Sequence, residues 1–301
     1  MAEPSMRSEQ EIRAFTADRE GVTIAAEEWT GPHAAPVVLI HGAGNSMVAW
    51  PDDFCRQLAT QRPVVRIDVR DAGQSTSWPA GEPDYTLRDL VADVVAVVDA
   101  TGRPEFHVVG VSMGGAIAQL LALEHPDRVR SITIISGTPG GPGHDAADLP
   151  RMTPELEAVF SAEGPVPDWS DREAVVDYLV EAERRFLGDR GFDLDQQSAI
   201  ARATVDRAKD LAASSTNHFM IDPGPAWRDR LGTLRRPALI VHGEADPLFP
   251  VEHGRALQAE IPDSVLLVLE GHGHGFPPPS MWNVLLSEIE RNIERGARAS
   301  A

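Results

Sequence analysis

Short runs of β-branched and aliphatic residues alternate along this chain with longer segments of amphipathic character. Such runs, when Gly, Pro or polar turns bound them, are typical of buried strands. Strands that alternate with helices form a largely parallel sheet covered on both faces. The pattern therefore predicts an α/β fold, a mostly parallel twisted sheet with helices on both faces, preceded by an N-terminal ribbon. The predicted strands are residues 37–40, 64–68, 106–109, 129–135, 238–241 and 265–269.

The segments between these runs have the apolar spacing of helices that pack against a sheet. In residues 87–100 apolar side chains recur every three or four positions, and residues 113–124 are apolar almost all round. Residues 48–60 are a further predicted helix, which contains Cys55, the only cysteine of the sequence. A single cysteine excludes a disulfide bond within the chain, and we expect Cys55 to be a small buried apolar side chain.

The alternation stops after residue 135, where a segment rich in Gly and Pro begins. The next ~90 residues show helical but no clear strand periodicity. The sequence therefore predicts a helical cap at residues 139–228, inserted into a core formed by residues 1–138 and 229–301. We expect most aromatic side chains of the cap to pack in its own small core, with some in the wall of a pocket. These aromatic residues are Phe160, Trp169, Phe186, Phe219 and Trp227.

The charge of the chain limits the partners that it can bind. The sequence has 27 Lys and Arg against 46 Asp and Glu, a formal net charge of −19 that repels phosphate backbones and anionic membranes. Residues 1–13 are polar, and no stretch approaches the roughly 18 apolar residues of a membrane span. We therefore expect a cytoplasmic protein with neither a nucleic-acid nor a membrane partner. The sequence gives no indication of the oligomeric state.

Residues 110–115, GVSMGG, fit the pattern G-x-S-x-G and lie between a predicted strand and a predicted helix. A sharp turn in this place lifts Ser112 above the sheet at the start of a helix, and side chains at positions 110 and 114 would clash in it. Helix N-termini favour negative charge, so the backbone N–H of Met113 is a candidate donor to an oxyanion. The turn predicts Ser112 as a nucleophile, the alternative being a serine that only caps the helix.

The loop after the first predicted strand, residues 41–44 with the sequence HGAG, can present a backbone N–H at the same edge of the sheet. We predict the N–H of Ala43 as the second oxyanion donor and His41 as a structural residue, because main-chain groups perform this task. A set of polar residues after the second predicted strand is expected to brace its loop through hydrogen bonds. These residues are Asp68, Arg70, Asp71 and Ser75.

A serine hydroxyl is a weak nucleophile, so it needs a base within hydrogen-bond reach and a carboxylate that orients this base. The turn after residues 238–241 offers two carboxylates, Glu244 and Asp246. The turn after residues 265–269 offers two histidines, His272 and His274. Spacing alone leaves the choice within each pair open.

The motifs HGAG, GVSMGG, HGEADP and GHGHGFP together resemble those of the α/β-hydrolase family, and the likeness spans almost the whole chain outside the cap. The resemblance implies an α/β-hydrolase fold. It also implies that the acid is the Asp of G-x-x-D-P, here Asp246, and that the base is the His of G-x-G-H-x-x-P, here His274. His272 then occupies a variable position. The dehalogenase and epoxide-hydrolase branches of the family use an aspartate where this chain has Ser112.

Three further segments are similar to the methyl-ester hydrolases of aromatic polyketide (anthracycline) biosynthesis: AWPDDF at 49–54, IDVRDAGQST at 67–76 and HVVGVSMGGAIAQLLAL at 107–123. This resemblance implies the methyl ester of a bulky apolar or polyketide-type substrate. The aromatic and proline residues near the predicted site suit such a substrate, with core packing as the alternative for each. They are Trp50 and Phe276, predicted to bind substrate, together with Trp78 and Pro277.

The predicted activity is the hydrolysis of a small-molecule carboxylic ester through an acyl-enzyme, by a Ser-His-Asp mechanism. The sequence has no cluster of ligands at zinc-like spacing and no phosphate-binding glycine loop, so we expect neither a metal nor an organic cofactor. The same residues support perhydrolysis and the hydrolysis of lactones, amides or carbon–carbon bonds, because the pocket sets the chemistry more than the fold does. A hypothesis from another class is a non-catalytic ligand receptor on the same fold.

Overall fold

The computed structural model describes residues 11–141, 146–162 and 166–298. Its centre is a sheet of eight strands in the order β1-β2-β4-β3-β5-β6-β7-β8, in which β3 to β8 are parallel and β2 is antiparallel to its neighbours. The predicted α/β fold is therefore confirmed. The strands are β1 (Ile12–Arg19), β2 (Val22–Trp29), β3 (Val37–Ile40), β4 (Val64–Ile67), β5 (Phe106–Val111), β6 (Val129–Ile135), β7 (Ala238–Gly243) and β8 (Ser264–Leu269).

The N-terminal ribbon is the hairpin of β1 and β2, which turns at Glu20 and Gly21. Both residues have positive φ, 52° and 83°, as a two-residue turn between twisted strands requires. Residues 1–10, which contain most of the polar segment predicted at 1–13, lie outside the described residues.

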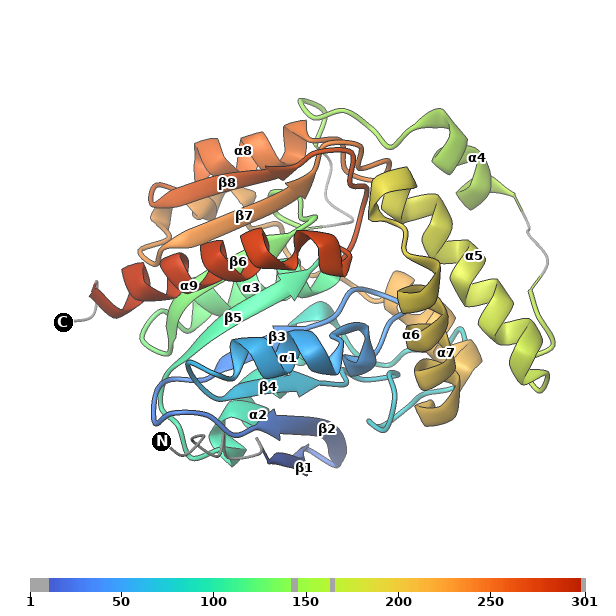
Figure 1. Cartoon of the computed structure of the whole chain (residues 1–301), viewed down its shortest axis with the longest axis horizontal. Helices are drawn as coiled ribbons and strands as arrows, with labels where there is room; N and C mark the ends of the chain where they lie inside the picture. The colour runs from blue at the N-terminus through green and yellow to red at the C-terminus, as the bar shows by residue number, and fades with distance from the viewer. Residues whose placement is uncertain (1–10, 142–145, 163–165, 299–301) are drawn as a thin grey trace, which may run out of the picture.

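Helices cover both faces of the sheet, as predicted (Figure 1). One face packs against α1 and α9 in a cluster that includes Phe54 and Ile289, and the other packs against α2, α3 and α8 in a cluster that includes Leu90 and Ile117. Periodic apolar side chains of α2 supply the second cluster, and a capping box of Thr86 and Asp89 fixes the start of this helix. These helices are α1 (Asp52–Leu58), α2 (Leu87–Ala100), α3 (Met113–Glu124), α8 (Glu252–Glu260) and α9 (Trp282–Arg298).

Several predicted boundaries differ from the structure. β5 and β7 run two residues past the predicted ends at 109 and 241, and β8 begins one residue before 265. The helix predicted at 48–60 is a 3₁₀ turn, Met47–Ala49, followed by α1, because Pro51 at the N-cap of α1 lacks the N–H that a continuous helix would use. The strand predicted at 64–68 ends at Ile67, and the carboxylate of Asp68 accepts hydrogen bonds from loop N–H groups. Cys55 is fully buried, as predicted, and burial raises the pKa of its thiol to about 12.

In the described part of the segment between β6 and β7 there are four α-helices, and Figure 1 shows them grouped beyond one edge of the sheet. Valines of α5 and α6, with Ala201, form a separate apolar cluster between these two helices. Within the described ranges, no helix has both the length and the apolar character needed to cross a membrane. The inserted helices are α4 (Pro154–Ser161), α5 (Arg172–Gly191), α6 (Leu194–Arg207) and α7 (Leu211–Thr216), and short 3₁₀ helices follow at Asn217–Phe219, Arg228–Thr233 and Pro279–Met281.

The register of the parallel strands aligns their carboxyl ends. Ile40, the last residue of β3, pairs with Ile67 of β4 and with Gly110 of β5. The loops that follow these three strands therefore begin at one edge of the sheet. In open α/β sheets, ligands bind at this edge.

Candidate active site

Ser112 lies in a strained turn between β5 and α3. Its backbone has φ 52° and ψ −110°, a conformation that costs a non-glycine residue about 1–3 kcal/mol. The N–H of Ser112 donates to the carbonyl oxygen of Ile135 on β6 at 2.9 Å, which fixes the turn to the sheet. Ser112 is half-buried, and among the described residues its hydroxyl has no hydrogen-bond partner. The hydroxyl is therefore free to meet a ligand.

The turn requires glycine at positions 110 and 114, as predicted. A Cβ atom at Gly110 would lie 2.0 Å from the carbonyl oxygen of Gly114, and one at Gly114 would lie 2.3 Å from the carbonyl oxygen of Ile40. Both contacts are with backbone, which cannot rotate away as a side chain can. The close approach of α3 to β3 and β5 therefore depends on these glycines.

His274 and Asp246 form a hydrogen-bonded pair from two different loops. The Nδ1–H of His274 donates to Oδ2 of Asp246 at 2.9 Å. The other oxygen of Asp246 accepts from the N–H groups of Leu248 and Phe249, so the carboxylate is fixed in place. Burial alone would raise the pKa of Asp246, but the hydrogen bond and charge of His274, with the neighbouring His242 and the Phe249 N–H, lower it. Asp246 is therefore an ionised group that holds the ring of His274 with Nε2 available.

The other candidates for the base and the acid, His272 and Glu244, lie apart from this hydrogen-bonded pair. His272 is fully buried, and its Nε2–H donates to the carbonyl oxygen of Gly275 at 3.1 Å. Glu244 is exposed and accepts a hydrogen bond from the N–H of Gly271. The geometry thus joins Asp246 with His274, the pair that the family motifs imply.

The loop after β3 lies directly against Ser112, because a Cβ atom at Gly42 would be 3.5 Å from the Cβ of Ser112. Nε2 of the buried His41 accepts a hydrogen bond from the N–H of Val69, and its Nδ1–H donates to the carbonyl of Gly42. His41 is thus structural, as predicted. No hydrogen bond of the described residues uses the N–H of Ala43 or that of Met113. Both groups are available to a ligand.

Ser112 and His274 line one pocket, with about 820 Å³ of empty space including the part open to solvent. No hydrogen bond joins the two side chains in the described structure, and catalytic hydrogen bonds are often looser without a substrate. Ala43 also lines the pocket, whereas the side chain of Met113 is buried and Met113 is not among the lining residues. The aromatic side chains that line it are Trp50, Phe160, Phe186, Phe219 and Phe276.

The other aromatic candidates are not among the residues that line this pocket. The Trp78 ring lies 5.0 Å from that of Tyr85, and the carbonyl of Pro277 accepts a hydrogen bond from Trp282. Trp169 packs against the cluster between α5 and α6, as expected of a cap residue. Trp227 differs from the prediction, because it is fully buried in the apolar cluster of the main sheet, where its Nε1–H donates to Gln119.

The sequence of this chain matches the model of a known family, described as alpha/beta hydrolase fold, over residues 35–277. This match covers well over half of the chain. The chain belongs to the α/β-hydrolase fold family. In the described residues of this α/β-hydrolase, no group of three or more His, Cys, Asp and Glu side chains could hold a metal ion.

Two hydrolases and one esterase of known structure are among the proteins similar to this chain. The rhodomycin D methylesterase DauP of Streptomyces sp. strain C5 is 29% identical over 280 residues, 86% of this chain and 91% of that protein. The 2-hydroxy-6-oxo-2,4-heptadienoate hydrolase of Pseudomonas putida is 29% identical over 249 residues, 79% of this chain and 82% of that protein. The crystal structure of the esterase RhEst1 from Rhodococcus sp. ECU1013 shares the fold, with a TM-score of 0.72, 22% identity, and coverage of 94% and 98%.

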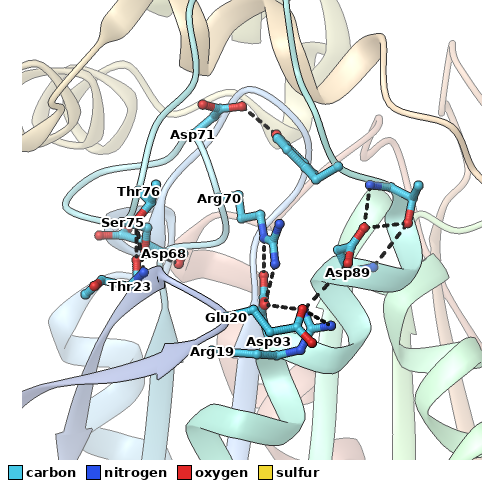
Figure 2. A network of polar contacts seen from close by, with 12 residues as sticks. Arg19, Glu20, Thr23, Asp68, Arg70, Asp71, Ser75, Thr76, Asp89 and Asp93 are labelled. Atoms are coloured by element: carbon cyan, nitrogen blue, oxygen red, sulfur yellow. Dashed lines mark hydrogen bonds and ion pairs between the residues drawn. The ribbon is translucent and has the colours of Figure 1, made fainter.

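The polar residues after β4 brace the loop in which they lie, as predicted. The hydroxyl of Ser75 donates to the carbonyl of Asp68 at 2.6 Å, and Arg70 forms two hydrogen bonds with the buried carboxylate of Asp93 on α2. Figure 2 shows this network, in which Arg19 also approaches Asp93. Asp71 accepts from Tyr85 and from Asn217, at the C-cap of α7, so it ties the loop to the inserted helices.

The inserted helix α5 supports the loop that carries His274. The N–H groups of Gly273 and His274 donate to the carbonyl oxygens of Leu187 and Phe186, at 2.7 and 2.6 Å. These carbonyls face the loop next to a break in α5, where Gly188 has the non-helical angles φ 70° and ψ 169°. The histidine of the α/β-hydrolase site is therefore held by the inserted helices as well as by the sheet.

Four polar residues that line the pocket were missed by the sequence analysis: Asn45 in the loop after β3, Glu183 on α5, and Gln196 and Gln197 on α6. The Nδ2–H of Asn45 donates to Oε1 of Glu183 at 3.2 Å. Burial raises the pKa of Glu183, although the Asn45 hydrogen bond and the charge of His274 oppose this effect. No motif marks these residues, because their place in the pocket depends on how the inserted helices pack.

We predict that His41 makes the protein sensitive to acid. Burial, with the charge of His218, lowers the pKa of His41 from 6.5 to about 4. The folded state keeps this ring neutral while the unfolded chain takes up a proton, so the stability conferred by its neutral form is present above pH 6.5 and lost as the pH falls toward 4. Each unit of pKa shift corresponds to about 1.4 kcal/mol, so the free energy of unfolding should fall by roughly 3 kcal/mol through this residue.

Urea unfolding of the wild type and of His41→Gln at pH 7 and pH 4 checks this prediction. The wild type should lose more stability than the variant between the two values. His33→Gln, which removes an exposed histidine, serves as the matched control and should lose as much as the wild type. Equal losses in all three proteins would contradict the assignment of this acid sensitivity to His41.

Proposed function

We propose that this α/β-hydrolase cleaves a carboxylic ester through an acyl-enzyme, with Ser112 as the nucleophile, His274 as the general base and Asp246 as the carboxylate that orients the base. One observation carries the proposal. The His274–Asp246 pair opens into the same pocket as the unpartnered hydroxyl of Ser112, which sits at the start of α3 in a strained turn. Ester hydrolysis by a serine enzyme requires a nucleophile, a base and an orienting acid in this arrangement.

In the proposed reaction, Oγ of Ser112 attacks the ester carbonyl carbon while Nε2 of His274 takes the hydroxyl proton. The N–H groups of Ala43 and Met113 bind the oxyanion of the tetrahedral intermediate, helped by the positive end of the α3 dipole. The alcohol leaves with the proton from His274. A water molecule, deprotonated by the same ring, then attacks the acyl group and releases the acid. Asp246 stabilises the imidazolium in both halves of the reaction.

We further propose a methyl ester of a bulky apolar or polyketide-type acid as the small-molecule substrate. The similarity to DauP of Streptomyces, a rhodomycin D methylesterase, supports this class at 29% identity. The aromatic lining of the pocket supports it as well. Trp50 and Phe276, with ring centroids 4.8 Å apart, line the pocket together with Phe186 and Phe219 of the inserted segment. Flat apolar groups pack well against such rings.

The inserted segment, proposed to span residues 139–228, would act as the cap of a core formed by residues 1–138 and 229–301. Its own apolar cluster and its contribution of Phe160, Phe186 and Phe219 to the pocket support this division. Residues 142–145 and 163–165, which belong to the proposed cap, lie outside the described residues.

Cleavage of a carbon–carbon bond is a second candidate, favoured by the similarity to the 2-hydroxy-6-oxo-2,4-heptadienoate hydrolase of Pseudomonas putida. A panel of substrates separates the two proposals. It runs from short p-nitrophenyl esters to methyl esters of polycyclic aromatic acids, with a 2-hydroxy-6-oxo-dienoate as the carbon–carbon substrate. We expect the highest kcat/KM on the methyl esters of large aromatic acids. Turnover of the dienoate without turnover of any ester would contradict ester hydrolysis and support the second candidate.

A further inference from the structure

The wall of the pocket carries polar side chains beside its aromatic ones. Glu183 of α5 and Gln196 of α6 line the pocket, and Asn45, from the loop after β3, donates a hydrogen bond to Glu183. All three side chains lie outside the proposed catalytic group. Polar groups in a largely aromatic pocket fix the orientation of a ligand and decide which ligands are accepted.

The hydrogen-bond capacity of this wall is only partly used. Asn45 donates to Oε1 of Glu183, and no hydrogen bond of the described residues uses Oε2. The side-chain amide of Gln196 is buried, and neither Nε2 nor Oε1 has a hydrogen-bond partner among the described residues. A buried amide without partners is costly, and nearly all such groups in native proteins are satisfied by protein, water or ligand. The amide of Gln196 and Oε2 of Glu183, on residues that line the pocket, are therefore left to be satisfied by water or by a ligand.

The chemistry of these groups selects among possible ligands. An amide both donates and accepts, and a carboxyl group with a raised pKa can accept as a carboxylate or donate as the neutral acid. A ligand hydroxyl also does both, so it matches the hydrogen-bonding capacity of Gln196 and of Glu183. An ammonium group only donates and would leave Nε2 of Gln196 unpaired, while a ligand carboxylate only accepts and would be repelled by an ionised Glu183.

We propose that Glu183 and Gln196 form a subsite that binds a hydroxyl group of the substrate, so that the enzyme selects hydroxylated aromatic esters over the same esters without the hydroxyl. This inference rests on the proposed ester hydrolysis and adds the substituent that the substrate carries. A site built to hydrogen-bond a hydroxyl rejects the analogue without it strongly, because its own buried polar groups are then left unpaired.

Methyl naphthoates that carry one hydroxyl at successive ring positions, each compared with methyl naphthoate itself, test the proposal by turnover. We expect the wild type to prefer at least one hydroxylated isomer by about tenfold or more in kcat/KM. Glu183→Met and Gln196→Met, which keep the length of the side chain but remove its polar head, should bring that ratio close to one. Glu183→Gln should retain most of the preference, because an amide also accepts and donates. Glu181→Met changes an exposed residue of the same helix and should keep the wild-type ratio.

Binding to Ser112→Ala, measured by calorimetry with the same ester pairs, separates failure of the subsite from failure of the proposed hydrolysis. Tighter binding of the hydroxylated ester in this background, lost when Glu183→Met or Gln196→Met is added, would support the subsite even if the wild type turned over no ester. Equal binding of both esters by Ser112→Ala would contradict the proposed subsite, whether or not the wild type hydrolyses the esters. A preference that survives both methionine substitutions would contradict it as well. Absence of ester turnover by the wild type would count against the hydrolysis alone.

Discussion

Ser112→Ala is expected to lower kcat/KM toward the preferred ester by at least about 10⁴-fold, because no other group can form the acyl-enzyme. The variant should fold normally, since the Ser112 hydroxyl has no hydrogen-bond partner among the described residues and alanine meets the same backbone strain at φ 52° as serine does. The measurement is the initial rate of ester hydrolysis, with circular dichroism and urea unfolding to confirm the fold.

Ser161→Ala provides a matched control for this substitution, because Ser161 is an exposed serine of the inserted helix α4. It should keep wild-type kinetics. A Ser112→Ala enzyme that retained more than about one hundredth of the wild-type kcat/KM would show that the serine is not the nucleophile.

His274→Ala is expected to cost at least about 10⁴-fold in kcat/KM, since the serine then has no base and the leaving alcohol has no acid. His272→Gln should stay within about tenfold of the wild type, because the ring of His272 donates to Gly275 and is not among the residues that line the pocket. Both substitutions fall in one loop, so the comparison separates chemistry from a general disturbance of that loop.

The rate of ester hydrolysis by the two histidine variants, together with their urea midpoints, is the measurement. Similar losses of activity in both variants would mean that the loop as a whole, and not Nε2 of His274, is needed. A larger loss in His272→Gln than in His274→Ala would reverse the proposed assignment of the base.

Much of the core was predictable because its sequence signals are local. The glycines at 110 and 114 are required by contacts within one turn, so the pattern G-x-S-x-G and the strand before it predicted the geometry around Ser112. The strands that precede the loops of Asp246 and His274 were equally recognisable as short apolar runs. The choice of His274 over His272 needed the family resemblance, since spacing did not decide it.

The sequence predicted that the inserted segment is helical, but it did not predict how the helices pack. The pocket-lining position of Glu183 and Gln196 depends on how α5 and α6 pack, and the place of Trp227 in the core of the sheet depends on its contact with Gln119. The hydrogen bonds from Gly273 and His274 to Leu187 and Phe186, beside the break in α5 at Gly188, join residues 86 and 88 positions apart, which no local pattern encodes. The residues that decide specificity were therefore the least predictable.

Covalent labelling with a fluorophosphonate probe tests the central claim most directly, because the probe reacts with an activated serine and needs no knowledge of the natural ester. The wild-type protein is incubated with the probe, and peptide mass spectrometry locates the adduct. The account predicts one adduct on Ser112, formed much more slowly in His274→Ala. Folded wild-type protein that forms no adduct, or an adduct on a residue other than Ser112, would contradict it.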